Sequence, residues 1–303
     1  MSVPSIPIVF SHANSFPAST YGVLFKSLKA RGFAVKAIEK FGHDPQYPVT
    51  NNWPHLVQQL IDFTQAEVDR TGEPVFLAGH SFGGFVSLMA AALAPTLARG
   101  VLLIDSPILG GWRATTLGVI KSAQMVGSVS PGATSQRRRT HWADAEAALE
   151  HFHHKKAFAK WEPQVLRDYI AHGTHDEGRG PDKKRVLSFD RTVETAIYNT
   201  LPDNLDRLLK RHPVKCPVSF IGGTHSAEMK QVGMAMTEKI THGRIMLLEG
   251  SHLFPMEKPI ATAAAIEAAL RSMQATALSS REPTLSSREP TLSSREPTLS
   301  SRT

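Results

Sequence analysis

The sequence lacks the features that mark a disulfide-stapled or membrane-anchored protein. Its 303 residues include one cysteine, Cys216, which excludes an internal disulfide and a cysteine-rich zinc site. No window reaches the ~18 apolar residues of a membrane-spanning helix, and the amino terminus lacks the basic and apolar regions of a signal peptide. We therefore expect a soluble, cytoplasmic protein with no membrane partner.

The excess of charge is small and unevenly distributed. The chain has 34 lysines and arginines against 27 aspartates and glutamates, a net charge of +7. Short basic runs at residues 137–139, 153–156 and 183–185 are expected to be solvated helix faces and loops. No recognition motif accompanies them, so we expect no nucleic-acid partner; at most they favour an anionic small-molecule substrate.

Histidines are frequent, but their spacing does not indicate a metal site. His151, His153 and His154 are the densest group, and they match no known pattern of metal ligands. We therefore expect neither a metal ion nor another cofactor.

The carboxyl terminus is repetitive and poor in apolar residues. The heptapeptide Leu-Ser-Ser-Arg-Glu-Pro-Thr begins at Leu278 and recurs from Leu285 and Leu292. A period of seven suggests a coiled coil, but each repeat lacks a second apolar position and carries a proline, which costs ~3 kcal/mol inside a helix. Residues 278–303 are therefore predicted to form a disordered tail.

Upstream of the tail, short apolar runs alternate with helical periodicity, the pattern of a parallel sheet covered by helices. The alternation stops after Pro107 and resumes near Pro217, which leaves a long segment of mostly helical pattern. We predict an α/β fold: an open, mostly parallel sheet of about six strands in a core of residues 1–106 and 211–277, with an inserted, mainly helical cap at 107–210. Strands are predicted at 6–10, 33–38, 74–78, 101–104, 217–221 and 244–248, and core helices at 21–28, 56–68, 83–93, 228–239 and 260–273.

The stretch Gly79-His80-Ser81-Phe82-Gly83 lies between a predicted strand and a predicted helix. This is the context of a nucleophile elbow, whose sharp turn strains the central residue and whose glycines let backbone segments approach closely. Such a turn lifts the hydroxyl of Ser81 above the sheet and directs the N–H of Phe82 at a developing oxyanion. Ser81 is therefore the predicted nucleophile.

A serine nucleophile needs an adjacent base that a carboxylate orients. His252 follows the last predicted strand, where a loop can bring its imidazole over Ser81. Two carboxylates compete for the third position. Asp105 ends the strand after the elbow helix and is preferred, whereas Glu228, after the next strand, is the alternative.

The loop Ser11-His12-Ala13-Asn14 directly follows the first predicted strand. It can supply a second oxyanion N–H, from Asn14 or Ala13, and one such donor is worth about 3 kcal/mol of transition-state stabilisation. His12, and His80 beside the nucleophile, are expected to support these loops.

Together these motifs resemble those of the α/β-hydrolase superfamily, with an oxyanion loop at 12–14, an elbow at 79–83 and a histidine loop at 250–252. The resemblance implies the fold predicted above, with a cap at the usual insertion point. Asn14 and an acid after the strand that follows the elbow are similar to the haloalkane dehalogenase and epoxide hydrolase branch. Those enzymes use an aspartate nucleophile where this chain has Ser81, so an acyl-enzyme mechanism fits better.

Three functions are compatible with these residues. The first is a serine hydrolase (carboxylesterase-like) of a small or medium carboxylic ester or thioester. The second is an acyltransferase or perhydrolase with the same triad, and the third is a ligand-binding homologue with little turnover. An intact triad favours the enzymes over the binding protein, and nothing in the sequence specifies an oligomeric state.

Overall fold

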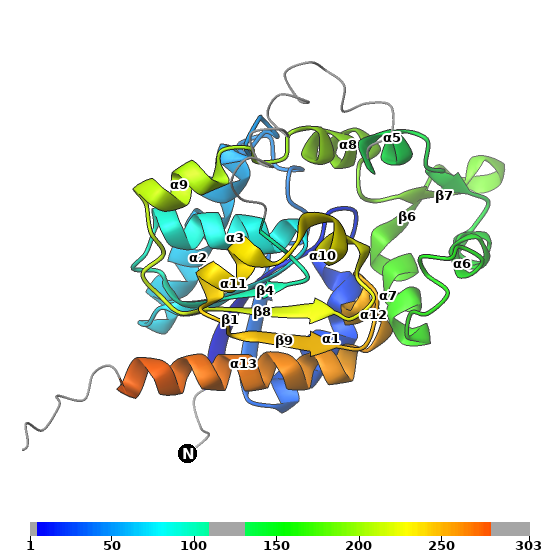
Figure 1. Ribbon diagram of the computed structural model, residues 1–303. Coiled ribbons are helices and arrows are strands. Elements are labelled where there is room, and N and C mark those ends of the chain that lie inside the picture. The colour runs from blue at the N-terminus through cyan, green and yellow to red at the C-terminus, as the bar shows by residue number, and fades with distance from the viewer. Residues whose placement is uncertain (1–4, 109–130, 280–303) are drawn as a thin grey trace, which may run out of the picture.

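The computed structural model describes residues 5–108 and 131–279, and at its centre lies a six-stranded sheet (Figure 1). Its strands pair in parallel throughout, in the order β2-β1-β3-β4-β8-β9. The strands are β1 (Ile6–Ser11), β2 (Phe33–Ala37), β3 (Val75–His80), β4 (Ala98–Ile104), β8 (Val218–Gly223) and β9 (Ile245–Leu248). The predicted α/β fold is confirmed, and each predicted strand is present with small shifts at its ends.

Helices cover both faces of this sheet. In Figure 1, α13 (Pro259–Ser279) lies below the sheet, and α1 (Gly22–Ala30) packs with it on that face. The helices α2 (Pro54–Thr71), α3 (Phe82–Leu93) and α9 (Leu205–Arg211) lie above the sheet. Side chains of a strand alternate between faces, so neighbouring residues of β4 enter different cores. Leu102 packs in the cluster that includes α1 and α13, and Leu103 packs in the cluster that includes α2 and α3.

The prediction of one continuous helix after β8 is wrong. Residues 228–239 fall into two short helices, α10 (Ala227–Val232) and α11 (Ala235–Thr241). Gly233 lies between them with φ of 82° and ψ of 170°, a non-helical conformation with positive φ that glycine adopts without a Cβ clash.

Between β4 and β8 the described chain forms helices and a second small sheet. The helices are α5 (Pro131–Gln136), α6 (Ala145–His153), α7 (Pro163–Gly173), the 3-10 turn η3 (Gly180–Asp182) and α8 (Arg191–Asn199), besides α9. The small sheet is antiparallel in the order β5-β7-β6, with β5 (His141–Trp142), β6 (Thr174–Glu177) and β7 (Lys184–Leu187). It escaped prediction because its strands have two to four residues and lack an apolar face.

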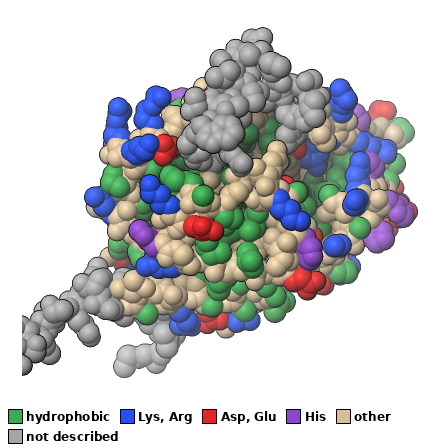
Figure 2. All heavy atoms as spheres, in the orientation of Figure 1, with side chains coloured by type: hydrophobic (Ala, Val, Ile, Leu, Met, Phe, Trp, Pro, Cys, Tyr) green, Lys and Arg blue, Asp and Glu red, His purple; other side chains and the backbone are tan. Residues whose placement is uncertain are grey.

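Apart from α9, which covers the main sheet, the described elements of this segment lie toward the carboxyl ends of the main strands (Figure 1), and their aromatic side chains extend the core cluster that includes α1 and α13. Phe152, Phe158, Trp161 and Tyr169 are buried together, and Phe16 of the core packs edge-on against three of these rings. Figure 2 shows histidine side chains gathered on the right of the molecule, where Figure 1 has α6 and β7. His153 and His154 are exposed, as expected for a solvated basic run.

The remaining elements are the turn η1 (Ala18–Tyr21) and α12 (Phe254–Glu257). Of the predicted tail, Leu278 and Ser279 belong to α13, and the rest lies outside the described residues. Within residues 5–108 and 131–279, no helix combines the length and apolarity that crossing a membrane requires.

Candidate active site

Ser81 lies in the sharp turn between β3 and α3, with φ of 53° and ψ of −119°. A non-glycine residue in this region is strained, and the surrounding packing must hold it there. A Cβ on Gly79 would meet the carbonyl of Gly83, and one on Gly83 would meet the carbonyl of Ser11. The two glycines therefore let β3, α3 and the end of β1 approach closely enough to impose the strained turn.

The Ser81 hydroxyl lies at one end of a hydrogen-bonded chain of side chains. Its Oγ is 2.9 Å from Nε2 of His252, and Nδ1 of that histidine is 2.6 Å from Oδ2 of Asp105. A carboxylate accepts and does not donate, so Nδ1 carries the proton and Nε2 is left to accept from the serine. The three residues follow the carboxyl ends of β3, β4 and β9, and because the strands are parallel these ends lie on the same side of the sheet.

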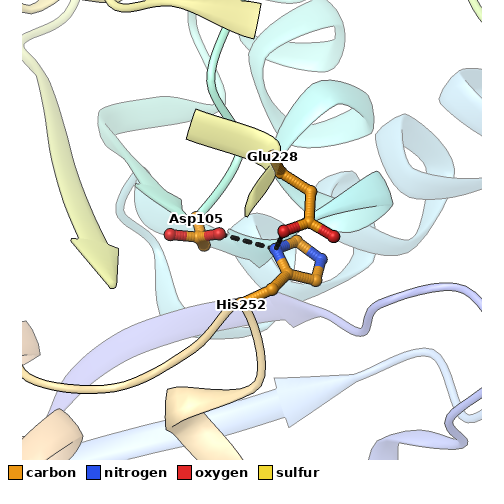
Figure 3. Close-up of side chains that lie close together, drawn as sticks. All are labelled: Asp105, Glu228 and His252. Carbon is orange, nitrogen blue, oxygen red and sulfur yellow. Dashed lines mark hydrogen bonds and ion pairs between the residues drawn. The ribbon is translucent and has the colours of Figure 1, made fainter. Parts of the chain in front are cut away.

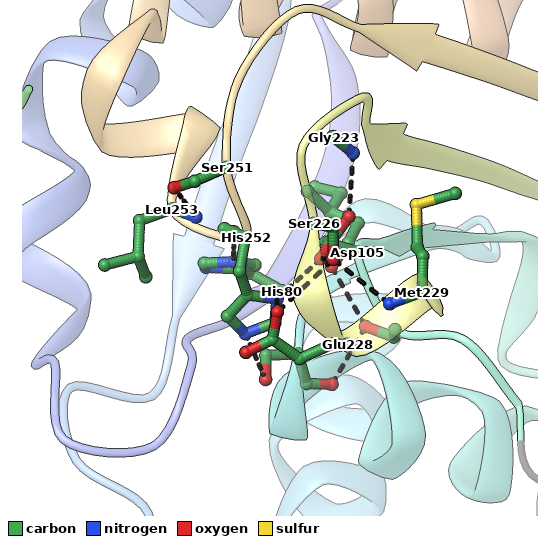
Figure 4. A network of polar contacts seen from close by, with 12 residues as sticks. His80, Asp105, Gly223, Ser226, Glu228, Met229, Ser251, His252 and Leu253 are labelled. Atoms are coloured by element: carbon green, nitrogen blue, oxygen red, sulfur yellow. Dashed lines mark hydrogen bonds and ion pairs between the residues drawn. The ribbon is translucent and has the colours of Figure 1, made fainter. Parts of the chain in front are cut away.

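Asp105 is fully buried, at the carboxyl end of β4, with φ of 44°. Besides His252 it accepts the N–H of Gly223 on Oδ1 at 2.7 Å and the hydroxyl of Ser226 on Oδ2 at 2.6 Å (Figure 4). Three donors thus surround this carboxylate, and hydrogen bonds to the charged form stabilise it. Asp105 is therefore held as a fixed acceptor for the imidazole.

Glu228, the alternative acid, also points toward His252 (Figure 3). Its Oε2 is 3.7 Å from Nδ1, beyond hydrogen-bond distance, and its side chain is 45% exposed. Among the described residues, Asp105, Glu228 and His252 are the one group of three whose ligand atoms lie within 4.8 Å of one another. Because Asp105 already engages the ring nitrogen, the geometry is that of a hydrogen-bonded pair with a second carboxylate nearby.

Two backbone N–H groups border the serine. Phe82 is the first residue of α3, where an N–H has no acceptor within the helix. On the other side lies the loop after β1, whose Asn14 and Ala13 line the same cavity as Ser81. The N–H of Ala13 donates to Tyr21 Oη at 3.0 Å, so of these two residues Asn14 is better placed to offer its N–H to a ligand.

A buried chain of hydrogen bonds joins the three loops of the site. His80 Nε2 lies 2.9 Å from the carbonyl oxygen of His252, which can only accept, so Nε2 carries the ring proton. Nδ1 of His80 must then accept, and it does so from Tyr21 Oη at 2.8 Å. Burial is the main cause that lowers the pKa of His80, to about 3. The ring stays neutral and links the elbow to the loop of His252 and, through Tyr21, to Ala13.

His12 has a similar supporting position. Its Nε2 accepts the N–H of Phe41 at 3.0 Å, and its Nδ1 donates to the carbonyl of Ala13 at 2.8 Å. Burial lowers the pKa of His12 to about 4, so this ring is also neutral and holds the loop after β1.

The serine opens into a cavity of about 470 Å³. Phe16, Ala157, Ala227 and Leu253 contribute apolar lining. The charged lining comprises two lysines and two glutamates: Lys156, Lys160, Glu228 and Glu257. A volume of this order is within the range of small-molecule sites. The space can hold an acyl group next to the serine.

Sequence reasoning missed several residues of the site. Tyr21, Ser226 and Glu194 hydrogen-bond to His80, Asp105 and Asn14, respectively, but none of the three belongs to a motif. The expectation of solvated basic runs is wrong for Arg138 and Arg185, whose side chains are 17% and 13% exposed and form ion pairs. A run of like charge does not reveal which member turns inward.

Comparison with known proteins supports the architecture. The model of the "Alpha/beta hydrolase family" matches residues 8–265. Monoglyceride lipase of Rattus norvegicus is 30% identical over 132 residues, which are 42% of this chain and 44% of that protein. A serine hydrolase-like protein of Dictyostelium discoideum is 25% identical over 256 residues, 79% of this chain and 68% of that one. The chain spans less than half the length of the monoglyceride lipases that it matches.

Solved structures share the fold at low sequence identity. A thioesterase domain from the curacin biosynthetic pathway superposes with a TM-score of 0.66 at 16% identity, covering 87% of this chain and 91% of that one. The peroxisomal alpha-beta-hydrolase Lpx1 of Saccharomyces cerevisiae superposes with a TM-score of 0.65 at 15% identity, covering 96% and 81%. Because the family model spans both core segments and the chain between them, this protein belongs to the alpha/beta hydrolase family.

Proposed function

We propose that this protein is a serine hydrolase that cleaves a small or medium carboxylic ester or thioester through an acyl-enzyme intermediate. The observation that carries the proposal is the chain from Ser81 Oγ through His252 to Asp105, with contacts of 2.9 and 2.6 Å. These distances lie within the range expected between a nucleophile, its base and the group that orients the base.

In the first step, His252 Nε2 takes the proton of Ser81 as its oxygen attacks the carbonyl carbon of the substrate. Asp105 keeps the proton on Nδ1 and stabilises the imidazolium that forms. The carbonyl oxygen becomes an oxyanion, and the N–H groups of Phe82 and Asn14 donate to it. Collapse of this intermediate expels the alcohol or thiol, which takes the proton from His252, and leaves an ester on Ser81.

In the second step, water replaces the leaving group. His252 removes a proton from the water as its oxygen attacks the acyl-enzyme, and the same two N–H groups hold the second oxyanion. Release of the carboxylic acid returns the proton to Ser81. No cofactor is needed for either step.

We assign residues 1–106 and 211–277 to the hydrolase core and 107–210 to a segment that forms a cap over the site, except that its last helix, α9, packs with α2 and α3 on the main sheet. Tyr198 of α8 and Lys156 of the α6–α7 connection line the cavity that contains Ser81, which supports a substrate-binding role for the cap. Monoglyceride lipases among the relatives support an ester as the substrate class. The two lysines in the cavity are matched by Glu228 and Glu257, so the charge of the lining does not by itself select an anionic ester.

Labelling with a fluorophosphonate tests the proposal, because this reagent reacts with an activated serine. We expect labelling of the wild type and of Ser19→Ala, which changes a partly buried serine outside the cavity, and none of Ser81→Ala or His252→Ala. An unlabelled wild type, or a labelled Ser81→Ala variant, would refute the assignment. Product analysis of p-nitrophenyl ester turnover with and without added methanol then separates hydrolysis, which yields free acid, from acyl transfer, which yields the methyl ester.

A further inference from the structure

One residue of α8 holds two consecutive residues of the loop that follows β1. The main-chain carbonyl of Glu194 accepts from Asn14 Nδ2 at 3.0 Å, and its carboxylate oxygen Oε1 accepts from Ser15 Oγ at 2.5 Å. Glu194 is 4% exposed, so both contacts are made out of water. The loop that carries the Asn14 N–H is therefore fastened to the segment inserted between β4 and β8.

The buried carboxylate of Glu194 is balanced by one cation. Arg138 Nη1 donates to Glu194 Oε2 at 2.7 Å, and Nη2 donates to Tyr169 Oη at 2.8 Å. Burial by itself would lower the pKa of Arg138, but the neighbouring Tyr169 and Glu194 outweigh it and raise that pKa. The guanidinium therefore stays charged and directs the carboxylate, leaving Oε1 for Ser15.

The loop needs such a tether because its backbone is strained. Ser15 has φ of 82°, in the left-handed region that side chains seldom adopt, and its N–H donates to Asn14 Oδ1 at 3.1 Å. Strained residues persist where surrounding contacts over-determine them. A loop released from Glu194 could relax at Ser15 and turn the peptide between Asn14 and Ser15. That turn would shift the backbone of Asn14 and, with it, the N–H in the preceding peptide.

We propose that Glu194, held by Arg138, is a positioning residue that aims the oxyanion donor of Asn14 through Ser15. The inserted segment thus does more than cover the cavity: its helix α8 completes the electrostatic part of the site. This inference rests on the proposed function, because it concerns a donor to the oxyanion of that reaction. It implies that loss of the tether lowers kcat and leaves KM nearly unchanged, since the oxyanion exists only in the transition state and intermediates.

A test must avoid leaving an unpaired buried charge, which destabilises a protein by itself. Two double variants meet this need, R138M/E194Q and R138M/E194L. Both remove the two charges and keep similar volumes, but only the glutamine retains an oxygen that can accept from Ser15. With p-nitrophenyl acetate as substrate, we expect kcat of the leucine variant to be about 10- to 100-fold below that of the glutamine variant, with KM within about threefold.

A second pair of variants tests the same inference and leaves the ion pair between Arg138 and Glu194 intact. Ser15→Ala removes the hydroxyl that donates to Glu194, and Ser19→Ala removes a hydroxyl that donates to Glu39 at 2.9 Å outside the cavity. We expect Ser15→Ala to lower kcat by about 10- to 100-fold and Ser19→Ala to change it by less than about twofold. This comparison decides the question if the leucine variant does not fold.

The outcomes separate the two proposals. A wild type that neither hydrolyses p-nitrophenyl acetate nor reacts with the fluorophosphonate would overturn the proposed function. An active wild type with equal kcat in Ser15→Ala and Ser19→Ala would overturn the role of Glu194 alone. A loss confined to KM would also overturn it, because it would assign the tether to substrate binding.

Discussion

Replacing Asp105 by asparagine removes one charge and keeps the shape of the side chain. In the native site, Oδ1 accepts the N–H of Gly223, and Oδ2 accepts from Ser226 and from His252 Nδ1. If the asparagine oxygen stays with Gly223, its NH2 group faces the imidazole. Nδ1 must then accept, the ring proton moves to Nε2, and the histidine can no longer take the proton of Ser81.

We expect this change to lower kcat by about 10³- to 10⁴-fold, which corresponds to about 4 to 5.5 kcal/mol at 1.36 kcal/mol per tenfold change. The expected effect of Glu228→Gln is much smaller. At 3.7 Å a unit charge contributes about 1 kcal/mol with the dielectric constant of bulk water, and the 45% exposure of the Glu228 side chain places this interaction near that limit. The corresponding loss in kcat is about fivefold.

The assay measures kcat and KM for p-nitrophenyl acetate with the wild type, Asp105→Asn and Glu228→Gln, all at one fixed pH near neutrality. The midpoint of thermal unfolding of each variant checks that it is folded. A large loss confined to Glu228→Gln would refute the reasoning, because it would make Glu228 the acid that orients His252. Comparable losses in both folded variants would show that the two carboxylates share the role.

Three further results are expected. Gly83→Ala should abolish soluble expression or lower the thermal midpoint by many degrees, because its Cβ meets the carbonyl of Ser11 and neither backbone can move cheaply; normal unfolding would contradict this. Tyr21→Phe should lower the free energy of unfolding, measured with denaturant, by about 1 to 3 kcal/mol, because it removes a buried hydroxyl that accepts from the Ala13 N–H and donates to His80. A decrease below about 0.5 kcal/mol would contradict this expectation. His80 has a folded pKa of about 3 against 6.5 in the unfolded chain, so the unfolded state binds the proton first and stability falls as pH drops below 6.5. His80→Gln should reduce the slope of unfolding free energy against pH between 4 and 6 by up to about 1.4 kcal/mol per pH unit, and an unchanged slope would rule out a buried neutral ring.

Much of the core could be predicted from sequence because it is encoded locally. The β3–α3 turn is specified by consecutive residues, since Gly79 and Gly83 allow the close approach that strains Ser81. The strands of the main sheet are apolar runs that a parallel sheet buries on both faces. The antiparallel sheet of the inserted segment lacks such a signal, because strands as short as His141–Trp142 carry no periodicity.

The sequence left two choices open at the site, and tertiary contacts bear on both. Asp105 and Glu228 are both acidic residues after strands, but only Asp105 lies within hydrogen-bond distance of His252. Asn14 and Ala13 are adjacent in one loop, but the N–H of Ala13 is engaged by Tyr21. The two residues of each pair offer the same kind of group, a carboxylate in the first pair and a backbone N–H in the second. Their roles therefore depend on which partner the fold brings to each group.

By itself the sequence determined the sheet, the elbow and the identity of Ser81 and His252 as candidate catalytic residues, because each depends on a short run of residues and its place between a strand and a helix. Only the tertiary structure decided which groups hold those residues in place. Glu194 lies 179 positions from the Ser15 that it holds, and Asp105 lies 147 positions from His252. Contacts at that separation depend on how strands and helices pack, and no local pattern of residue types records them.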